Sequence, residues 1–245
     1  MTSTINTELL RYATDSKTNA IDVQMTQWSQ FQDVDNVLKS NGEEWFYELR
    51  DVLKKHNALN RFGITLLHKH FDVADDEIML ETTDVENKTL HMRPVKTKDY
   101  IEKENAPLAA TSIRLVDGDN VAMQTYMWSQ LRNANDISRI SDSDVECLRE
   151  LRDVLKKYNA LDRFGIKLFY KQFEITEDEM LFETTDVQER TQIIRPVNVK
   201  YCQDREDMQA MITLWKMVED EPVVRLICAC GTGYDGNHNG YHVRH

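Results

Sequence analysis

The chain has 245 residues, of which 41% are hydrophobic and 29% are charged, as expected for a folded globular protein and not for a disordered one. The formal net charge of -12 opposes binding to nucleic-acid phosphates and to anionic membrane surfaces. No apolar run approaches the roughly 20 residues needed to cross a bilayer, and residues 1–17 lack a basic start and an apolar signal core, so we expect a soluble, cytoplasmic protein.

The sequence contains an internal repeat. The segment that begins at Leu49 aligns without a gap with the segment that begins at Leu151, and about 28 of 47 aligned positions are identical. Upstream, the tripeptide at 28–30 resembles the tripeptide at 128–130 (Trp-Ser-Gln in both). These matches predict a tandem duplication, with a first repeat at 8–97, a linker at 98–109, a second repeat at 110–200 and an extension at 201–245.

Each repeat is predicted to begin with a β-hairpin that is followed by a helix. In the second repeat, Asp117-Gly118 between two apolar segments is a hairpin turn signal, although a helical interpretation of the second strand stays open. Ser40-x-x-Glu43 and Ser143-x-x-Glu146 have capping-box spacing and precede apolar residues at helical intervals. We expect these helices to end near the Lys-Lys pairs at 54–55 and 156–157, because cations suit a helix C-terminus.

Three strand-like runs follow each predicted helix, at 63–71, 77–84 and 89–95 and again at 165–173, 179–186 and 191–197. Their alternation and the polar turns between them are typical of an antiparallel meander. The fold class is therefore α+β, with two ββαβββ-like units whose antiparallel sheets are related by a pseudo-twofold axis. An amphipathic C-terminal helix is expected at 204–219, with apolar residues at helical intervals (Met208, Met211, Ile212, Trp215 and Val218).

His68 and His70 are the first candidates for metal ligands. Residues two apart on a strand point to the same face, so the two imidazoles should lie together. The second repeat has Tyr170 and Gln172 at these positions, so a site built on the histidines would be single and asymmetric. The alternative is that both histidines make ordinary hydrogen bonds on a half-exposed sheet face.

The C-terminal extension supplies further candidate ligands. Cys228-x-Cys230 ends an apolar strand-like run, and His238 and His242 follow in a Gly/Asn-rich segment. Thiolate and imidazole ligands together favour zinc, or reduced copper, over magnesium or calcium. The alternative is a buried strand with two small, soft residues, followed by a frayed tail.

Other motifs are weaker. The Glu-Thr-Thr-Asp sequence at 81–84 recurs at 183–186, and we interpret it first as turn chemistry at the end of a strand. The sequence lacks the nucleophile elbow, the zincin motif and the kinase motifs, so it supports no serine, zincin or phosphoryl-transfer scheme.

The residues therefore predict a protein that binds one transition metal, zinc before copper or iron, through Cys228, Cys230, His68 and His70, with His238 and His242 next. One alternative is a non-catalytic module in which a sheet edge or face binds a partner protein or a second copy of the chain. Another is a small-molecule enzyme with a pocket between the two repeats, since ligand sites favour such interfaces.

Overall fold

The structure is a computed structural model. It describes residues 13, 15, 17–18, 20–32, 45–103, 108–118, 120–131, 139–170, 172–176, 178–198, 200, 210–219 and 222–229. The fold is mixed α and β, with few helices among these residues. None of the described helices is long and apolar enough to cross a membrane.

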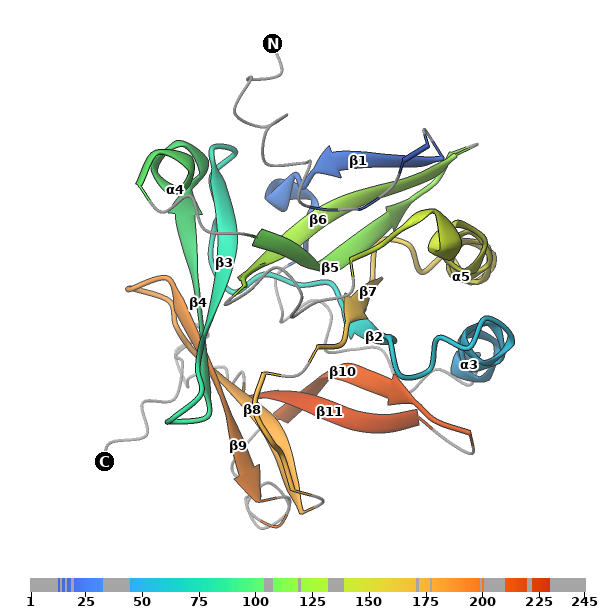
Figure 1. Ribbon diagram of the computed structural model, residues 1–245. Coiled ribbons are helices and arrows are strands. Elements are labelled where there is room, and N and C mark those ends of the chain that lie inside the picture. The colour runs from blue at the N-terminus through green and yellow to red at the C-terminus, as the bar shows by residue number, and fades with distance from the viewer. Residues whose placement is uncertain are drawn as a thin grey trace.

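Eleven strands of the described residues form one sheet, which curls until its ends meet (Figure 1). The strands are β1 (Ile21–Met25), β2 (Phe62–Leu66), β3 (Glu77–Asp84), β4 (Thr89–Lys96), β5 (Leu108–Val116), β6 (Val121–Gln130), β7 (Phe164–Leu168), β8 (Glu179–Asp186), β9 (Thr191–Asn198), β10 (Ala210–Met217) and β11 (Pro222–Ala229). Their order is β1-β6-β3-β4-β9-β8-β11-β10-β2-β7-β5, and β5 also pairs with β6. This last pairing closes a ring of strands, and β1 lies alongside β6 as an addition to it.

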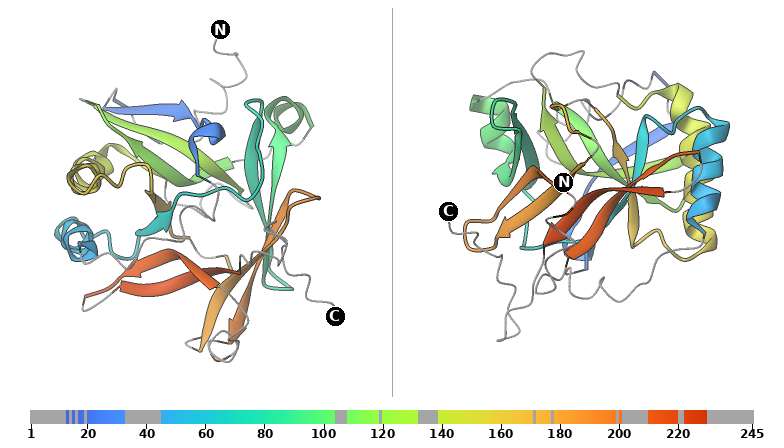
Figure 2. Two further views of the ribbon diagram at one scale, coloured as in Figure 1. Left: turned by 180° about the vertical axis from the view of Figure 1, so that it is seen from behind. Right: turned by 90° about the horizontal axis from the view of Figure 1, so that it is seen from below.

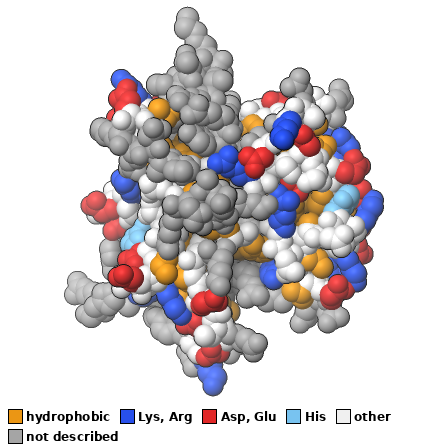
Figure 3. Space-filling view, in the orientation of Figure 1, with side chains coloured by type: hydrophobic (Ala, Val, Ile, Leu, Met, Phe, Trp, Pro, Cys, Tyr) orange, Lys and Arg blue, Asp and Glu red, His pale blue; other side chains and the backbone are white. Residues whose placement is uncertain are grey.

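Two helices pack side by side outside the ring (Figure 2), α3 (Phe46–Lys55) and α5 (Val145–Lys157). Both end at the predicted Lys-Lys pairs, and an asparagine with a left-handed backbone follows each of them, at Asn57 (φ 54°) and Asn159 (φ 53°). Ala58 N–H donates to the Leu53 carbonyl at 2.7 Å, as in a Schellman motif. Acidic and basic side chains are interspersed over the face that carries these helices (Figure 3).

The predicted hairpin at Asp117-Gly118 is confirmed, because β5 and β6 pair in antiparallel fashion around it. β3 with β4, and β8 with β9, are antiparallel pairs as predicted. The second repeat also shows the predicted element order, two strands, a helix and three strands. Its capping box uses Ser141 and Asp144, in the short 3-10 helix η2 (Asp142–Asp144) that precedes α5, instead of Ser143 and Glu146. Ser40 and Glu43 lie outside the described residues.

Other predictions about the fold were wrong. The C-terminal helix is instead strand β10 over the described part of 204–219, because residues there pair with β11 on one side and with β2 on the other. Ile212, Thr213 and Trp215 favour strands, and this pairing overrides the helical spacing of the apolar residues. β2 pairs with β7 and β10 and not with β3, so the three-strand meander does not form. Residues 98–109, the predicted linker, include most of α4 (Thr97–Lys103) and the start of β5, and the division of the chain into two repeats stays a prediction.

The resemblance between the tripeptides at 28–30 and 128–130 does not extend to their conformation. Trp28–Gln30 forms a 3-10 turn, η1, whereas Trp128 to Gln130 ends strand β6.

Buried apolar side chains form two clusters. The larger cluster joins α3 and α5 to the sheet, through residues such as Leu49, Leu151 and Ile166. The smaller cluster includes Trp28, Tyr126 and Ile194 and is the one that surrounds the cavity described below.

Candidate metal centre

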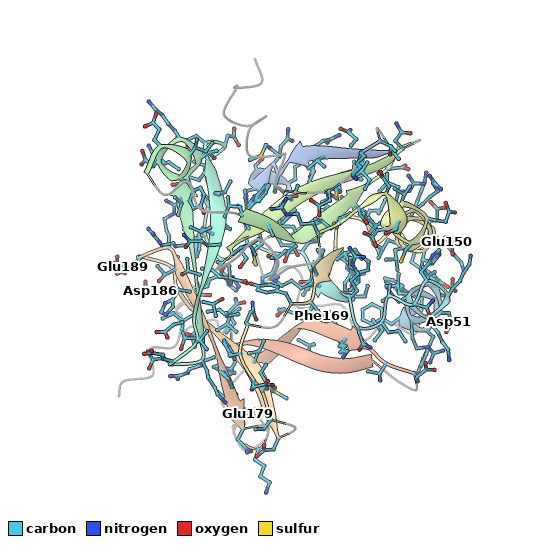
Figure 4. All side chains as sticks on the ribbon, viewed as in Figure 1. Asp51, Glu150, Phe169, Glu179, Asp186 and Glu189 are labelled. Carbon is cyan, nitrogen blue, oxygen red and sulfur yellow. The ribbon has the colours of Figure 1, made fainter. Side chains whose placement is uncertain are left out.

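A cavity of about 290 Å³ lies among the strands of the ring. Apolar and aromatic side chains make up much of its wall, and Phe169 can be seen on the inner side of the ring in Figure 4. Two buried glutamates, Glu81 and Glu183, also line it, although they are only 1% and 3% exposed. A cavity with a mainly apolar wall and a few converging polar groups is the usual form of a ligand site.

His68, His70 and Glu183 bring their potential ligand atoms to within 4.8 Å of one another. The two histidines follow the end of β2, and Glu183 lies in the middle of β8, on the other copy of the repeat. His68 Nε2 is 3.1 Å from His70 Nε2, which is 2.9 Å from Glu183 Oε1. Zinc–nitrogen distances of about 2.0–2.1 Å place two imidazole nitrogens about 3.3 Å apart in a tetrahedral site and about 2.9 Å apart at a right angle. The observed nitrogen separation lies between these values.

Hydrogen bonds from outside the triad orient its members. His68 Nδ1 is 3.0 Å from the Leu66 carbonyl oxygen, which can only accept, so Nδ1 donates and Nε2 presents a lone pair when the ring is neutral. Gln192 Nε2 donates to Glu183 Oε1 at 2.7 Å. Metal-binding histidines usually donate their second ring N–H to a carbonyl or carboxylate in this way, and ligating carboxylates usually accept further hydrogen bonds.

The carboxyl group of Glu183 is ionised although it is buried. Burial raises its pKa, but the hydrogen bond from His70 and the positive charge of the imidazoles outweigh burial, and the net pKa is lowered. The His70 side chain beside it is only 4% exposed. A buried carboxylate needs a cationic partner, which is either a protonated imidazole or a metal ion.

The counterpart of Glu183 in the first repeat, Glu81, has a different set of partners. Tyr170 donates to Glu81 Oε1, Gln172 Nε2 donates to the same oxygen at 3.0 Å, and Lys167 Nζ lies 3.4 Å from Oε2. Tyr170 and Gln172 occupy the positions of His68 and His70 in the sequence repeat. Ser129 Oγ is 2.6 Å from the Tyr170 hydroxyl and extends this network.

The predicted site residues have different outcomes. His68 and His70 lie together as expected, although they follow β2 instead of belonging to it. Cys228 is in β11, and its backbone is the register partner of Glu183; its side chain is not described. Cys230, His238 and His242 lie outside the described residues, so their part in a site stays a prediction.

Sequence reasoning missed Glu183 and Glu81, because the Glu-Thr-Thr-Asp motif was interpreted as turn chemistry. In the structure that interpretation fits Asp84 and Asp186, whose carboxylates accept backbone N–H groups in the following turns. Each glutamate instead lies inside a strand, directly after three apolar residues. A charged residue in the middle of an apolar strand was the signal that could have found them.

Cys147, in α5, does not belong to the cavity. It is buried, and burial raises the pKa of its thiol to about 12, so it stays protonated and unreactive.

Comparison of the chain with protein-family models, with curated proteins and with solved structures finds no match.

Proposed function

We propose that the protein binds a single transition-metal ion, zinc before copper or iron, through His68, His70 and Glu183. The observation that carries this proposal is the convergence of two imidazoles and one ionised carboxylate at the wall of one cavity. Two nitrogen ligands and one oxygen ligand suit a zinc site with an open position, and also suit iron(II). A cytoplasmic location stays a prediction from composition.

The balance of charge supports the metal at Glu183 and not at Glu81. Lys167 places an ammonium group beside Glu81, so that carboxylate already has a cation. The residue equivalent to Lys167 in the first repeat is Thr65, which carries no charge. The ionisable partner in direct contact with Glu183 is His70, and a divalent ion would serve both neutral imidazoles and the carboxylate.

A fourth ligand could come from Cys228. Its register pairing with Glu183 in neighbouring parallel strands brings the two backbones together. We propose its thiolate as the fourth ligand, in keeping with the sequence prediction, and water as the alternative. With water in the open position, the ion would lower the pKa of that water toward neutrality, as in hydrolytic enzymes.

We also infer that the chain is a tandem duplication whose two copies pack about a pseudo-twofold axis. The support is a set of reciprocal contacts between equivalent residues. Ile64 lies opposite Ile166, its own counterpart, and His91 lies opposite Ile193. Leu67 N–H donates to the Arg163 carbonyl at 2.8 Å, and Phe169 N–H donates to the Arg61 carbonyl at 2.8 Å.

The pairing of strands suggests where the copied unit begins and ends. β6 lies parallel to β3 at Ser129 and Glu81, and β11 lies parallel to β8 at Cys228 and Glu183. The hairpins β5–β6 and β10–β11 thus hold the same relation to the strands that precede them. We infer units that run from the helix through five strands, about 46–130 and 145–229, in place of 8–97 and 110–200.

A second candidate function is that of a small-molecule enzyme. The cavity favours it, because residues at equivalent positions of the two repeats line it and differ in chemistry: His68 and Tyr170, His70 and Gln172. An asymmetric cavity of this kind can orient one substrate next to one metal ion.

Metal analysis of protein without a His tag tests the proposal. We expect about one equivalent of metal after zinc is supplied and the excess removed, and less than about a tenth of an equivalent in a His68→Ala/His70→Ala variant. The matched control is Tyr170→Ala/Gln172→Ala, which changes the equivalent positions and should keep the metal. Wild-type protein that stays metal-free after zinc, copper and iron are tried in turn would contradict the proposal.

Cobalt(II) separates the two candidates for the fourth ligand. With a Cys228 thiolate, the cobalt-loaded protein should show sulfur-to-cobalt charge transfer in the near ultraviolet, and Cys228→Ser should abolish this band. A cobalt spectrum without the band, together with unchanged metal content in Cys228→Ser, would assign the fourth position to water.

A further inference from the structure

The charged side chains in the wall of the cavity balance one another. Among the described residues that line it, three are lysines, three are glutamates and none is an aspartate or an arginine: Lys69, Lys167, Lys216, Glu81, Glu179 and Glu183. Lys69 also pairs with Asp72, and Glu179 lies 4.0 Å from Lys88. These two outside partners have opposite signs, so they leave the balance unchanged.

A metal ion bound by neutral imidazoles would end this balance, because it brings positive charge that no residue of the wall offsets. His68 is partly exposed and lines the cavity together with His70 and Glu183, so an ion held by the three would lie at the cavity wall. Charge in such a partly buried place is stabilised by a partner of opposite sign. The ligand that suits the metal-loaded cavity is therefore an anion.

Apolar side chains adjoin the proposed metal ligands. Leu181 lies two residues before Glu183 in β8, and Ile194 lies two residues after Gln192, the hydrogen-bond partner of Glu183, in β9. Residues two apart on a strand share a face, and all four line the cavity. Phe71 also lines it, and both Phe71 and Leu181 are only partly buried. An anion that reaches the ion would bring the rest of its surface against these apolar groups.

The composition and volume of the cavity indicate the shape of the apolar part. Phenylalanines and methionines are prominent in the wall, and both make favourable contacts with aromatic rings: Phe71, Phe169, Phe173, Met79, Met92, Met127 and Met180. An apolar cavity of about 150 Å³ can hold benzene, so the volume of about 290 Å³ has room for about two fused rings.

We propose that the cavity binds an aromatic carboxylate of about one or two rings, whose carboxylate oxygen coordinates the metal ion and whose rings lie against the apolar wall. This proposal rests on the proposed metal site and names the ligand class of that site. The carboxylate offsets the charge of the ion. It takes the place of water in the open position or, beside a Cys228 thiolate, adds a fifth ligand, which zinc can accept.

Three probes test the proposal: 2-naphthoate, 2-naphthamide with the same shape and no charge, and acetate with the carboxylate and no rings. Equilibrium dialysis uses the zinc-loaded full chain, with the zinc content of each sample measured. Naphthoate should bind at least about tenfold more tightly than naphthamide, through the bond between its charged oxygen and the ion. It should bind roughly 100-fold more tightly than acetate, through burial of the rings.

Removal of the metal separates the two parts of the ligand. After zinc is removed with EDTA, the preference for naphthoate over naphthamide should vanish while naphthamide binds as before. His68→Ala/His70→Ala should behave like the metal-free protein, and the matched variant Tyr170→Ala/Gln172→Ala should keep the preference. In the cobalt(II)-loaded protein, naphthoate should change the visible absorption bands of the ion and naphthamide should not.

Retained binding of naphthamide shows that a variant's cavity is intact, so a lost preference cannot be attributed to misfolding. The ligand proposal alone is overturned if zinc-loaded protein binds naphthoate no more tightly than naphthamide or acetate, or binds no probe. It is also overturned if the preference survives removal of the metal or leaves the cobalt spectrum unchanged. Wild-type protein that takes up no metal overturns this proposal together with the metal site.

Discussion

Glu81 and Glu183 occupy the same position in the two copies of the repeat, and both are buried in the wall of one cavity. Each lies in a strand that has a parallel neighbour, β6 for Glu81 and β11 for Glu183. Their surroundings differ in the nature of the cation. The carboxylate of Glu81 lies beside the fixed ammonium group of Lys167, whereas that of Glu183 lies beside His70.

This difference shows how one repeated backbone can hold two kinds of polar site. Each glutamate lies at the equivalent position of its strand, and the residues that contact it differ. The Glu81 carboxylate has a lysine side chain as its partner within the protein. Histidine can lose its proton and become a metal ligand, which leaves its site able to accept an ion.

The largest loss in the free energy of unfolding should come from removing the carboxylate of Glu81, which lies beside Lys167. Glu81→Gln leaves Lys167, whose side chain is 14% exposed, without its counter-ion. Breaking a buried pair in this way costs about 3–5 kcal/mol. We expect such a loss in the free energy of unfolding, measured by urea denaturation of the metal-free protein at pH 7.5.

The matched variant Glu183→Gln should lose less, about 1 kcal/mol, because it weakens hydrogen bonds to His70 and Gln192 and leaves no lysine ammonium group beside the changed residue without its ion-pair partner. Equal losses from the two variants would show that the two ends of the cavity do not differ in the way proposed.

The elements that were predicted correctly from sequence depend on local signals. The helices that end at Lys55 and Lys157, and the turn at Asp117-Gly118, require only capping, periodicity and turn chemistry. β10 was mistaken for a helix because its strand identity comes from pairing with β2, a segment far away in the chain. Sequence periodicity alone carries no information about that pairing.

The site was only half predicted for the same reason. The spacing of His68 and His70 predicted their proximity, since residues two apart in an extended segment share a face. Glu183 reaches them only because β8 of the other copy lies across the cavity, and the closure of the ring through β5 and β6 could not be read from spacing.

Replacing the residues near Glu81 by their equivalents near Glu183 tests the comparison directly. The triple variant Lys167→Thr/Tyr170→His/Gln172→His gives Glu81 the residues that face Glu183. We expect a second equivalent of zinc, bound at least about 100-fold more tightly than any zinc at this end of the wild-type cavity, a difference of about 2.7 kcal/mol. Zinc titration with a competing chelator measures it, with the double variant that keeps Lys167 as the control. If the triple variant binds no more zinc than the wild type, the residues at these three positions are not what distinguishes the surroundings of Glu81 from those of Glu183.

A second pair of equivalent glutamates, Glu77 and Glu179, lies at the starts of β3 and β8 and contacts the other copy. Arg190 holds Glu77 through two N–H groups, one of them 3.2 Å from Oε1, whereas Lys88 Nζ lies 4.0 Å from Glu179. The pKa of Glu77 is lowered mainly by Arg190. The pKa of Glu179 is lowered mainly by hydrogen bonds from Thr176, with Lys88 as a minor influence.

Glu77→Gln should therefore cost about 1 kcal/mol at pH 6, the upper end for a partly exposed ion pair, and Glu179→Gln should cost less. Since the folded pKa of Glu77 lies below its unfolded value of about 4.3, this stabilisation is present above that value and is lost as the pH falls through the folded pKa. Urea unfolding of wild type and variant between pH 6 and 3 should show the two stabilities converging at the acid end. A difference that persists unchanged to pH 3 would mean that Glu77 stabilises the fold through its shape and not through its charge.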